Sequence, residues 1–591
     1  MKQFLITFAA VIAAGFVLTV VPLLIMMVMA TAALMGSSST KVKPGTILKL
    51  NLSEAISDRD MDSPAIRARS FLGSGDGTSH GLNTLRDALA DAAEDDNIAA
   101  IMLTGSYVNA TWTDMRDIRR ALQEFKEVSQ KPIYFFGNNM VDGVAYVASL
   151  ADSVFVTPGG SVMLAGCISS KVYFKKMADK FGIGFDVIKH GKYKAAVEPY
   201  FRDSMSPEDR EQTMRYLNIV WSEIRDTIAA GRGIKPEVVD SYVDELKGLR
   251  GNVTAAVEAG LIDAEAFYDQ FEDKLRLLAG LDADTDPTIV NIFDYAPEIE
   301  TSINTKAEKV AIVYAEGQIY DGKSNSDDAN IYGDDLAATL RKLRKDKQVK
   351  AVVMRVNSPG GSASASDVIW REVEMLKQEK PVIVSMGSYA ASGGYYISCA
   401  ANQIVAEPNT ITGSIGVFGV VPNAGKLTNE LGVSLDVAST SKNPLVTGFS
   451  PLSEPVLSAL TASVEETYKR FVDRVCQGRE MNFEAVDSIG GGRVWAGADA
   501  VSIGLVDRLG NLDDAIDMAA EEAGLSDDFV TEDFPKLDDS MTAIMKQLGL
   551  SVRTSIGNAI LGPEFQQFEK MKQKLESPEG FVWAVCDMEV K

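Results

Sequence analysis

Short apolar runs alternate along the chain with stretches of helical spacing. Residues 310–314, 351–356 and 382–385 are almost wholly apolar, which is typical of strands that are buried on both faces. Between these runs, residues 334–343 and 366–377 carry apolar side chains three and four positions apart, as an amphipathic helix does. Strand and helix in alternation predict a largely parallel sheet with helices packed against it. We therefore expect an α/β fold.

The longest apolar stretch lies near the beginning of the sequence. Residues 3–40 contain no charged side chain, and residues 4–35 are mostly apolar, which exceeds the ~20 residues that a membrane-spanning helix needs. A cleaved signal peptide has an apolar stretch of only ~7–15 residues. The pattern therefore predicts an uncleaved N-terminal transmembrane helix within residues 1–43. Lys2 precedes it and Lys41 and Lys43 follow it, so these charges leave its orientation open.

Two parts of the chain resemble each other. Residues 181–187, Phe-Gly-Ile-Gly-Phe-Asp-Val, match residues 431–437, Leu-Gly-Val-Ser-Leu-Asp-Val, at an offset of 250. The same offset relates residues 143–158 to residues 393–408. Because similarity at a fixed offset is the mark of a duplication, we expect two copies of one domain.

The boundary between the copies is expected within residues 273–305, a stretch rich in Asp and Pro that has no clear pattern. After about residue 525 the similarity ends, and the rest has a mixed helical pattern. The predicted parts are a transmembrane anchor at 1–43, an N-terminal repeat at 44–300, a C-terminal repeat at 301–525 and a helical tail at 526–591.

Composition narrows the function classes. The 591 residues are 46% hydrophobic and 24% charged, as in ordinary globular proteins of several domains. The formal net charge of −24 repels phosphate backbones, which argues against nucleic acid as a partner. The four cysteines form no C-x-x-C pair, and the two histidines, His80 and His190, lie in no metal-binding motif. We therefore expect neither a metal nor another cofactor.

The second copy has a pair of glycines that the first copy lacks. The run Arg355-Val-Asn-Ser-Pro-Gly-Gly-Ser362 directly follows a predicted strand, and the first copy has Thr104–Thr111 there, without the pair. Adjacent glycines let backbone N–H groups turn toward a ligand, which is one way to build an oxyanion hole. An ordinary turn is the alternative.

A serine also distinguishes the second copy. Ser414 lies between Gly413 and Gly416 at the expected start of a helix, whereas the first copy has Leu164 at that position. Small neighbours leave the hydroxyl of a serine approachable, so Ser414 could act as a nucleophile. The alternative is a serine that caps a helix.

A serine nucleophile needs a base, and histidine is the usual one. His190 is the only histidine near a matching motif, but Lys194 follows four residues later, where the second copy has Pro444. Burial disfavours the ammonium form, so a buried lysine can serve as the base. A solvated surface lysine is the alternative. Since Lys194 occurs only in the first copy and Ser414 only in the second, a site shared between the copies is expected.

At these residues the chain resembles the signal peptide peptidase A family, SppA, in its long duplicated form. The resemblance rests on five motifs, which are Arg355-Val-Asn-Ser-Pro-Gly-Gly-Ser362, Ala390-Ala-Ser-Gly-Gly-Tyr-Tyr396, Ile411-Thr-Gly-Ser-Ile-Gly-Val-Phe-Gly419, Tyr193-Lys-Ala-Ala-Val-Glu-Pro199 and Gly492-Arg-Val-Trp-Ala-Gly497. It implies duplicated ClpP/crotonase-like domains and a membrane-bound serine protease. Such an enzyme hydrolyses hydrophobic signal peptides, after their release from preproteins, by a Ser-Lys dyad.

The resemblance also assigns roles. It implies that Ser414 is the nucleophile, that Lys194 is the general base and that the N–H groups of Gly361 and Ser414 form the oxyanion hole. Ser439, on the strand end that matches Lys189, is expected to help orient the lysine. The family further implies a tetramer-like homo-oligomer in the bacterial inner membrane, with a single span and the catalytic part in the periplasm.

Two other functions remain open on the sequence. A crotonase-like acyl-CoA enzyme would use the same kind of oxyanion hole, but it needs neither a Ser-Lys pair nor a membrane anchor. A non-catalytic membrane scaffold would need only that both copies oligomerise. The presence of Ser414, Lys194 and the glycine pair favours the protease over both.

Overall fold

A computed structural model describes residues 42–60, 79–250, 253–282, 285–295, 307–324, 330–526, 528–536 and 583–585. The predicted anchor falls almost entirely outside these residues. Within the described ranges, no helix is both long and apolar enough to cross a membrane. The chain forms two compact units. The first contains the described residues up to Leu164 and from Ile228 to Glu300, and the second contains Ala165–Thr227, those from Thr301 to Lys536, and Trp583–Val585.

The first unit is built on a parallel sheet with the strand order β8-β6-β5-β4-β1-β9. Its strands are β1 (Thr46–Asn51), β4 (Ile98–Thr104), β5 (Ile133–Val141), β6 (Ser153–Met163), β8 (Ala264–Glu265) and β9 (Ile289–Asn291), and β2 (Ile56–Ser57) pairs separately with β3 (His80–Gly81). Its helices include α3 (Leu82–Glu94), α4 (Trp112–Ser129), α5 (Asp142–Ala148), α9 (Pro236–Asp244), α10 (Val253–Glu258) and α11 (Tyr268–Leu278).

The second unit contains a larger sheet with the order β19-β17-β15-β13-β10-β21, to which β16 and β20 are added beside β15. The strands are β10 (Lys309–Glu316), β13 (Val349–Ser358), β15 (Val382–Ala391), β16 (Gln403–Ala406), β17 (Ile411–Gly413), β19 (Val494–Ala496), β20 (Arg508–Leu509) and β21 (Val530–Phe534). All of its pairs are parallel except that between β17 and β19. The three buried strands predicted from apolar runs are thus confirmed.

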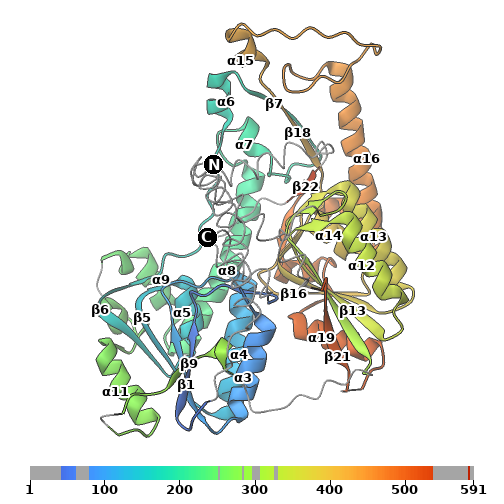
Figure 1. Cartoon of the computed structure of the whole chain (residues 1–591). Coiled ribbons are helices and arrows are strands. Elements are labelled where there is room, and N and C mark those ends of the chain that lie inside the picture. Colours follow the sequence, from blue (N-terminus) through green and yellow to red (C-terminus); the bar gives the residue numbers. More distant parts are fainter. Residues whose placement is uncertain are drawn as a thin grey trace, which may run out of the picture. The chain divides into compact units, whose positions relative to one another are not determined.

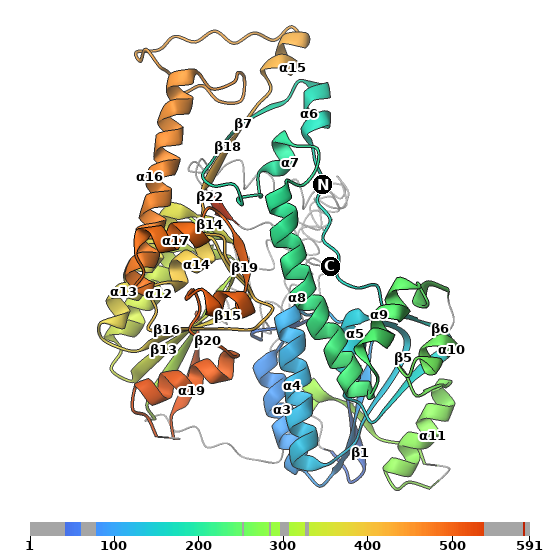
Figure 2. The ribbon, with the colours of Figure 1, turned by 180° about the vertical axis from the view of Figure 1, so that it is seen from behind.

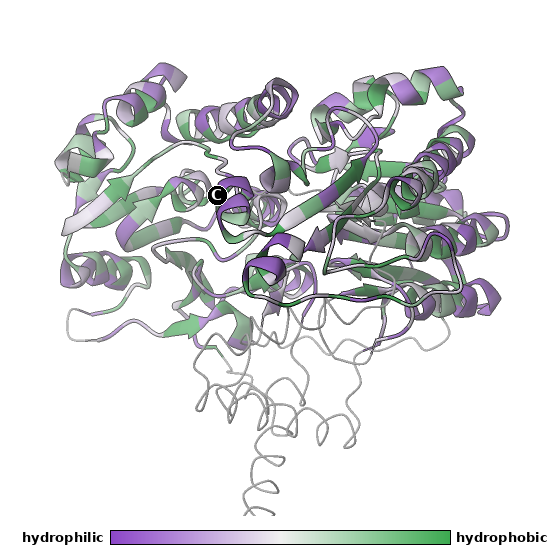
Figure 3. Ribbon diagram, turned by 90° about the horizontal axis from the view of Figure 1, so that it is seen from above, coloured by the Kyte–Doolittle hydropathy of each residue, from purple (hydrophilic) through white to green (hydrophobic). Residues whose placement is uncertain are grey.

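Both faces of this sheet are buried, as the apolar runs predicted. Because side chains alternate along a strand, Ala311 and Val313 of β10 pack into one core and Val310 and Ile312 into another. The first core includes residues of α12 (Gly333–Lys345) and α13 (Ala363–Lys377), and the second includes residues of α19 (Leu512–Glu522). Figure 3 shows the strands largely in the hydrophobic colour and the helices in a mixture of both colours.

A second sheet of this unit has the order β12-β11-β14-β22-β18-β7. Its strands are β7 (Gly184–Lys189), β11 (Ile319–Tyr320), β12 (Ile331–Tyr332), β14 (Gly360–Ser362), β18 (Phe418–Asn423) and β22 (Trp583–Val585). Strands β7 and β18 run antiparallel side by side, with Phe418 opposite Lys189 and Asn423 opposite Gly184 (Figure 1).

The pairing of β7 with β18 bears on the predicted domains. The sequence repeat that contains Lys194 was expected at 44–300, but residues Ala165–Thr227 cluster with the second unit. This segment carries α6 (Lys175–Phe181), α7 (Glu198–Phe201) and the first part of α8 (Pro207–Arg232). The structure therefore brings a segment of the first sequence repeat into the compact unit of the second.

The tail beyond residue 525 was expected to be helical. Those of its residues that the structure describes include two strands, β21 at the edge of the larger sheet and β22 in the second sheet. The rest of the predicted tail lies outside the described residues.

Candidate functional site

Ser414 lies in the short loop between β17 and β18, not at the start of a helix as the sequence suggested. Its φ of +50° falls in the left-handed region, which is costly for a residue with a side chain. Its N–H donates to the carbonyl of Arg493 at 2.7 Å, and the residue is 2% exposed. Backbone strain of this kind concentrates at functional positions.

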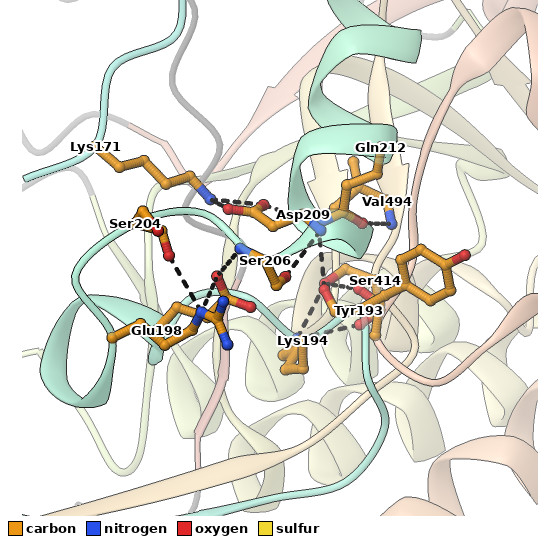
Figure 4. A network of polar contacts seen from close by, with 12 residues as sticks. Lys171, Tyr193, Lys194, Glu198, Ser204, Ser206, Asp209, Gln212, Ser414 and Val494 are labelled. Atoms are coloured by element: carbon orange, nitrogen blue, oxygen red, sulfur yellow. Dashed lines mark hydrogen bonds and ion pairs between the residues drawn. The ribbon is translucent and has the colours of Figure 1, made fainter. Parts of the chain in front are cut away.

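Lys194 reaches the same place from the segment between β7 and α7. Its Nζ lies 3.0 Å from the Oγ of Ser414 and 3.2 Å from the carbonyl oxygen of Ser414 (Figure 4). The lysine is 1% exposed, although lysine is almost never fully buried without partners. The structure thus brings together the two residues predicted as nucleophile and base, and both belong to the second unit.

Two glycines make room for the lysine. A Cβ on Gly492, whose φ is +83°, would lie 2.6 Å from the Cβ of Lys194 and 2.7 Å from its backbone nitrogen. A Cβ on Gly416 would lie 3.3 Å from the Cδ of Lys194 and 2.7 Å from the Cα of Gly492. Larger side chains at either position would displace the lysine from Ser414.

Ser392 is a site residue that sequence reasoning missed. It lies between β15 and α14 (Gly393–Ser398), is fully buried, and accepts a hydrogen bond from the Nζ of Lys194 at 2.8 Å. Its backbone is also in an unfavourable region, with φ +55° and ψ −115°. Its N–H donates to the carbonyl of Gly413 at 2.8 Å, which holds it beside the strand that leads to Ser414. The comparison of the two sequence repeats could have identified Ser392, because the first repeat has Asp142 at the matching position.

The structure does not bring Ser439 to the lysine. Ser439 is exposed, and its hydroxyl accepts a hydrogen bond from the N–H of Ser441 at 3.0 Å. The hydroxyl that touches the amine is that of Ser392. The expectation that Ser439 orients Lys194 therefore finds no support in this conformation.

His190, the alternative base, has other partners. Its Nδ1 lies 2.8 Å from a carboxylate oxygen of Glu465, and its ring stacks on Tyr468 with 3.6 Å between centroids. Burial and a hydrogen bond to Asp487 raise the pKa of the Tyr468 hydroxyl above its ordinary value. The N–H of His190 donates to the carbonyl of Val417. These contacts attach the C-terminal end of β7 to residues of the second repeat. His190 therefore has a structural role.

Helix α8 fixes the position of the segment between β7 and α7 that contains Lys194. The side-chain amide of Gln212 donates to the carbonyl of Tyr193 at 3.2 Å and accepts from the N–H of Val494 at 3.0 Å. It thereby links Tyr193, which precedes Lys194, to Val494. Val494 follows Arg493, and the carbonyl of Arg493 accepts the hydrogen bond from the N–H of Ser414. Gln212 therefore connects the backbone beside Lys194 with the backbone beside Arg493, the residue that binds Ser414.

Buried carboxylates fix the beginning of α8 (Figure 4). Asp209 is fully buried and forms an ion pair with Lys171 at 2.9 Å. Glu198 accepts from the N–H of Ser206 at 3.0 Å, and the hydroxyl of Ser206 accepts from the N–H of Asp209 at 3.1 Å. Buried charges are stable only when they are paired or hydrogen-bonded in this way. This network explains the Glu198 of the lysine motif as a support of the loop.

Gly361, the predicted oxyanion donor, is buried in β14. A Cβ at this position would lie 2.0 Å from the carbonyl oxygen of Ile319 in β11, so the strand pairing requires glycine here. The N–H of Ser414, the second predicted donor, is engaged by Arg493 in this conformation. The oxyanion hole of Gly361 and Ser414 therefore stays a prediction.

The chemistry at hand is that of a hydroxyl beside a buried amine, which is the arrangement of a nucleophile and its general base. In the part of the chain that the structure describes, no group of three or more His, Cys, Asp or Glu side chains is placed to hold a metal ion.

The family model described as Peptidase family S49 matches residues 126–282 and 374–526, one segment in each sequence repeat, and that described as Clp protease matches residues 304–411. Protease 4 of Haemophilus influenzae is 37% identical over 456 residues, which cover 76% of this chain and 74% of that protein. Protease 4 of Salmonella typhi is 36% identical over 531 residues, which cover 87% and 85%. The chloroplastic serine protease SPPA of Arabidopsis thaliana is 30% identical over 493 residues, which cover 82% and 70%.

These matches confirm the protease expected from the motifs, together with the duplicated ClpP-like α/β fold, and they disfavour the acyl-CoA enzyme and the scaffold. The chain belongs to peptidase family S49 and is a serine protease.

Proposed function

We propose that this protein hydrolyses hydrophobic signal peptides after their release from preproteins, with Ser414 and Lys194 as a catalytic dyad. The observation that carries the dyad is the 3.0 Å contact between the Nζ of Lys194 and the Oγ of Ser414 inside a buried site. A serine hydroxyl is a weak nucleophile, and a neutral amine at this distance can take its proton.

The partners of Lys194 fit a neutral amine. Such an amine has two N–H donors and one lone pair. The carbonyl of Ser414 and the hydroxyl oxygen of Ser392 can accept the two donors, which leaves the lone pair for the proton of Ser414 Oγ. The hydroxyl proton of Ser392 can point to the carbonyl of Gly416 at 3.5 Å. Burial of the lysine favours this uncharged form.

The reaction then has two halves. The Oγ of Ser414 attacks the peptide carbonyl while its proton passes to Lys194, and the N–H of Gly361 stabilises the resulting oxyanion. Lys194 gives the proton to the departing amine, which leaves an ester on Ser414. A water molecule, deprotonated by Lys194, attacks that ester, and the carboxyl product departs as the proton returns to Ser414.

We expect Ser392 to position the amine. Replacing Ser392 with alanine should lower kcat by about 10–100-fold, because the amine loses the hydroxyl that holds it. A hydroxyl acceptor also favours the ammonium form, so the acid limb of the pH–rate profile should move about 0.5–1 unit to lower pH. The measurement is kcat against pH for wild type, Ser392→Ala and Ser392→Gly.

The Ser392→Gly variant distinguishes the effect of the hydroxyl group from the effect of the backbone conformation at this position. The φ of +55° suits glycine better than serine. If Ser392 served only the backbone, Ser392→Gly would keep both the rate and the position of the acid limb, and the positioning role would be wrong.

The choice of substrate rests on the resemblance to the SppA family and on the name of the chloroplastic relative. We further propose that residues 1–43 anchor the chain in the bacterial inner membrane by a single span, with the catalytic part in the periplasm.

The substrate proposal is tested with two synthetic peptides of equal length, a hydrophobic signal peptide and a polar peptide. The full chain in detergent should cleave the first at least about tenfold faster, as judged by mass spectrometry of the products. Equal rates would leave a serine protease without this preference.

The duplication supports a homo-oligomer. In the chain, β7 pairs with β18. Shifted by the repeat offset of 250, these strands correspond to residues 434–439 and 168–173. Each segment exposes apolar side chains at alternate positions, Ile168 and Val172 in the first repeat and Leu435 and Val437 in the second. We propose that 434–439 of one copy pairs with 168–173 of the next, a head-to-tail contact that can close into a ring.

This contact predicts a mutant with a smaller assembly. Leu435→Asp should lower the particle mass measured by light scattering in detergent, because the charge would be buried between strands. Asp436→Asn, which alters the neighbouring exposed position and adds no charge, is the control. An unchanged mass for Leu435→Asp would exclude this pairing.

A further inference from the structure

The turn that leads into β19 is bonded to the segment of the nucleophile. We call residues 491–493 the β19 turn. The N–H of Ser414 donates to the carbonyl of Arg493 at 2.7 Å, and the N–H of Gly492 donates to the carbonyl of Ile415 at 2.8 Å. These two hydrogen bonds continue the antiparallel ladder of β17 and β19 and fix the backbone of the serine.

The same turn is bonded to the segment of the lysine. The carbonyl of Gly491 accepts a hydrogen bond from the N–H of Tyr193, the neighbour of Lys194, at 3.2 Å. A Cβ on Gly191 would lie 2.2 Å from the carbonyl oxygen of Gly491, so the two backbones pack directly against each other. The β19 turn therefore joins the backbones of the proposed nucleophile and the proposed base.

The side chain of Arg493 strengthens the contact with Tyr193. Its guanidinium carbon lies 4.7 Å from the ring centroid of Tyr193 and 4.5 Å from the ring centroid of Trp495. Its terminal nitrogens donate to the hydroxyl of Tyr193 at 3.0 Å and to the carboxylate of Glu211 at 2.8 Å. The Tyr193 hydroxyl in turn donates to Glu211 at 3.2 Å. A guanidinium suits this place because its planar group stacks on aromatic rings while its edge donates to two acceptors.

A second arginine provides a comparison. Glu211 belongs to the first part of α8, which lies beside β19 (Figure 2). Arg215, one turn further along α8, forms an ion pair with Asp499 of α18 (Gly497–Ser502) at 2.7 Å. Both arginines thus join α8 to the region of β19, but Arg215 lies outside the turn that is bonded to the serine.

We propose that Arg493 is a positioning residue of this protease, which sets the distance between the Nζ of Lys194 and the Oγ of Ser414. Its carbonyl holds the serine, and its guanidinium holds the ring next to the lysine. The proposal rests on the Ser-Lys dyad proposed above, since it concerns the distance between the two members. A displacement of about 1 Å at the reacting atoms can lower a rate by about 10²-fold.

The kinetic test compares Arg493→Met with Arg215→Met. With the hydrophobic peptide as substrate, Arg493→Met should lower kcat by about 10–100-fold and change KM by less than about twofold, because the bound peptide meets a misaligned dyad. Arg215→Met removes an ion pair of the same kind from the same helix, and its kcat should stay within about twofold of the wild type. Equal kcat values for the two variants would overturn the proposal.

Arg493→Lys keeps the charge and decides the question if Arg493→Met does not fold. An ammonium has no planar group that stacks on the rings while it bonds both Tyr193 and Glu211, so kcat should still fall at least about threefold. A wild-type kcat for Arg493→Lys would contradict the positioning role.

A double variant shows whether the effect passes through the lysine. In a Lys194→Met chain no amine is left to position, so the further change Arg493→Met should lower the residual single-turnover rate by less than about twofold. A loss as large as in the wild-type background would mean that Arg493 acts independently of Lys194, against the proposal.

Hydrogen exchange measures the β19 turn without catalysis. In Ser414→Ala chains, the amide hydrogens of residues 414 and 492 should exchange at least about tenfold faster with Arg493→Met and at an unchanged rate with Arg215→Met. Equal exchange in both would exclude the guanidinium as the support of the turn. If Ser414→Ala and Lys194→Met hydrolyse the peptide at the wild-type rate, the dyad and this inference both fail. If those two lose activity and Arg493→Met does not, the inference alone fails.

Discussion

Ser414→Ala is expected to lower kcat/KM for peptide hydrolysis by about 10⁴-fold, which corresponds to ~5 kcal/mol of transition-state stabilisation. The reason is that the ester intermediate cannot form without the hydroxyl, and the remaining groups can only polarise the peptide. The measurement is the rate of cleavage of the hydrophobic peptide under single-turnover conditions, with the Tm of each variant as the measure of folding.

Two observations make the variant interpretable. Ser414 is 2% exposed, and alanine removes one hydroxyl while it leaves the Cβ, so we expect a change in stability within about 1 kcal/mol. Ser439→Ala is the matched control, because Ser439 is an exposed serine of the same repeat. Activity that survives in Ser414→Ala and is lost in Ser439→Ala would reverse the assignment made from the geometry.

Lys194→Met is the second large effect, with an expected loss in kcat on the order of 10³-fold. Methionine has a similar length and fills the same space without an amine, so the proton of Ser414 has no acceptor. In the wild type the rate should rise with pH as the ammonium of Lys194 loses its proton, and this rise should be absent from the residual activity of the variant. The pH–rate profiles of both proteins provide the measurement.

The control for the lysine lies two residues away. Lys192 is exposed and its Nζ lies over the ring of Tyr193, 5.2 Å from the centroid, so Lys192→Met removes a charge from the same segment. It should keep the wild-type rate. A Lys194→Met protein with full activity and an unchanged pH profile would require another base, and His190→Gln would then be the variant to measure.

Much of the second unit could be predicted because its strands are buried on both faces. The apolar runs of β10, β13 and β15 reflect cores on both sides of the sheet, and the helices between them show the expected spacing. Ser414 and Lys194 could be found because the duplication supplies an internal comparison in which each copy lacks one of them.

Other features depend on contacts between distant residues and could not be read from local pattern. Small residues around Ser414 suggested a helix start, but the segment forms a loop that leads into the antiparallel ladder of β7 and β18, and the N–H of Ser414 donates to the carbonyl of Arg493. Ser392 was missed for the same reason, since its hydroxyl meets the amine of a lysine 198 residues earlier in the chain. Ser439 was favoured because it matches Lys189 in the repeat, but the structure pairs only the β7 copy of that strand.

The separation of the two reactive groups along the chain also has a consequence during synthesis. Lys194 and Ser414 are 220 residues apart, and β19, which follows the carbonyl that holds Ser414, ends at Ala496. At about 5–20 residues per second, a ribosome adds those 220 residues in roughly 10–45 s. Throughout this interval the nascent chain contains the amine of Lys194 but not yet the hydroxyl of Ser414. If Ser414 and Lys194 form the dyad, the growing chain cannot cut other polypeptides until the ribosome has passed β19, which ends at Ala496.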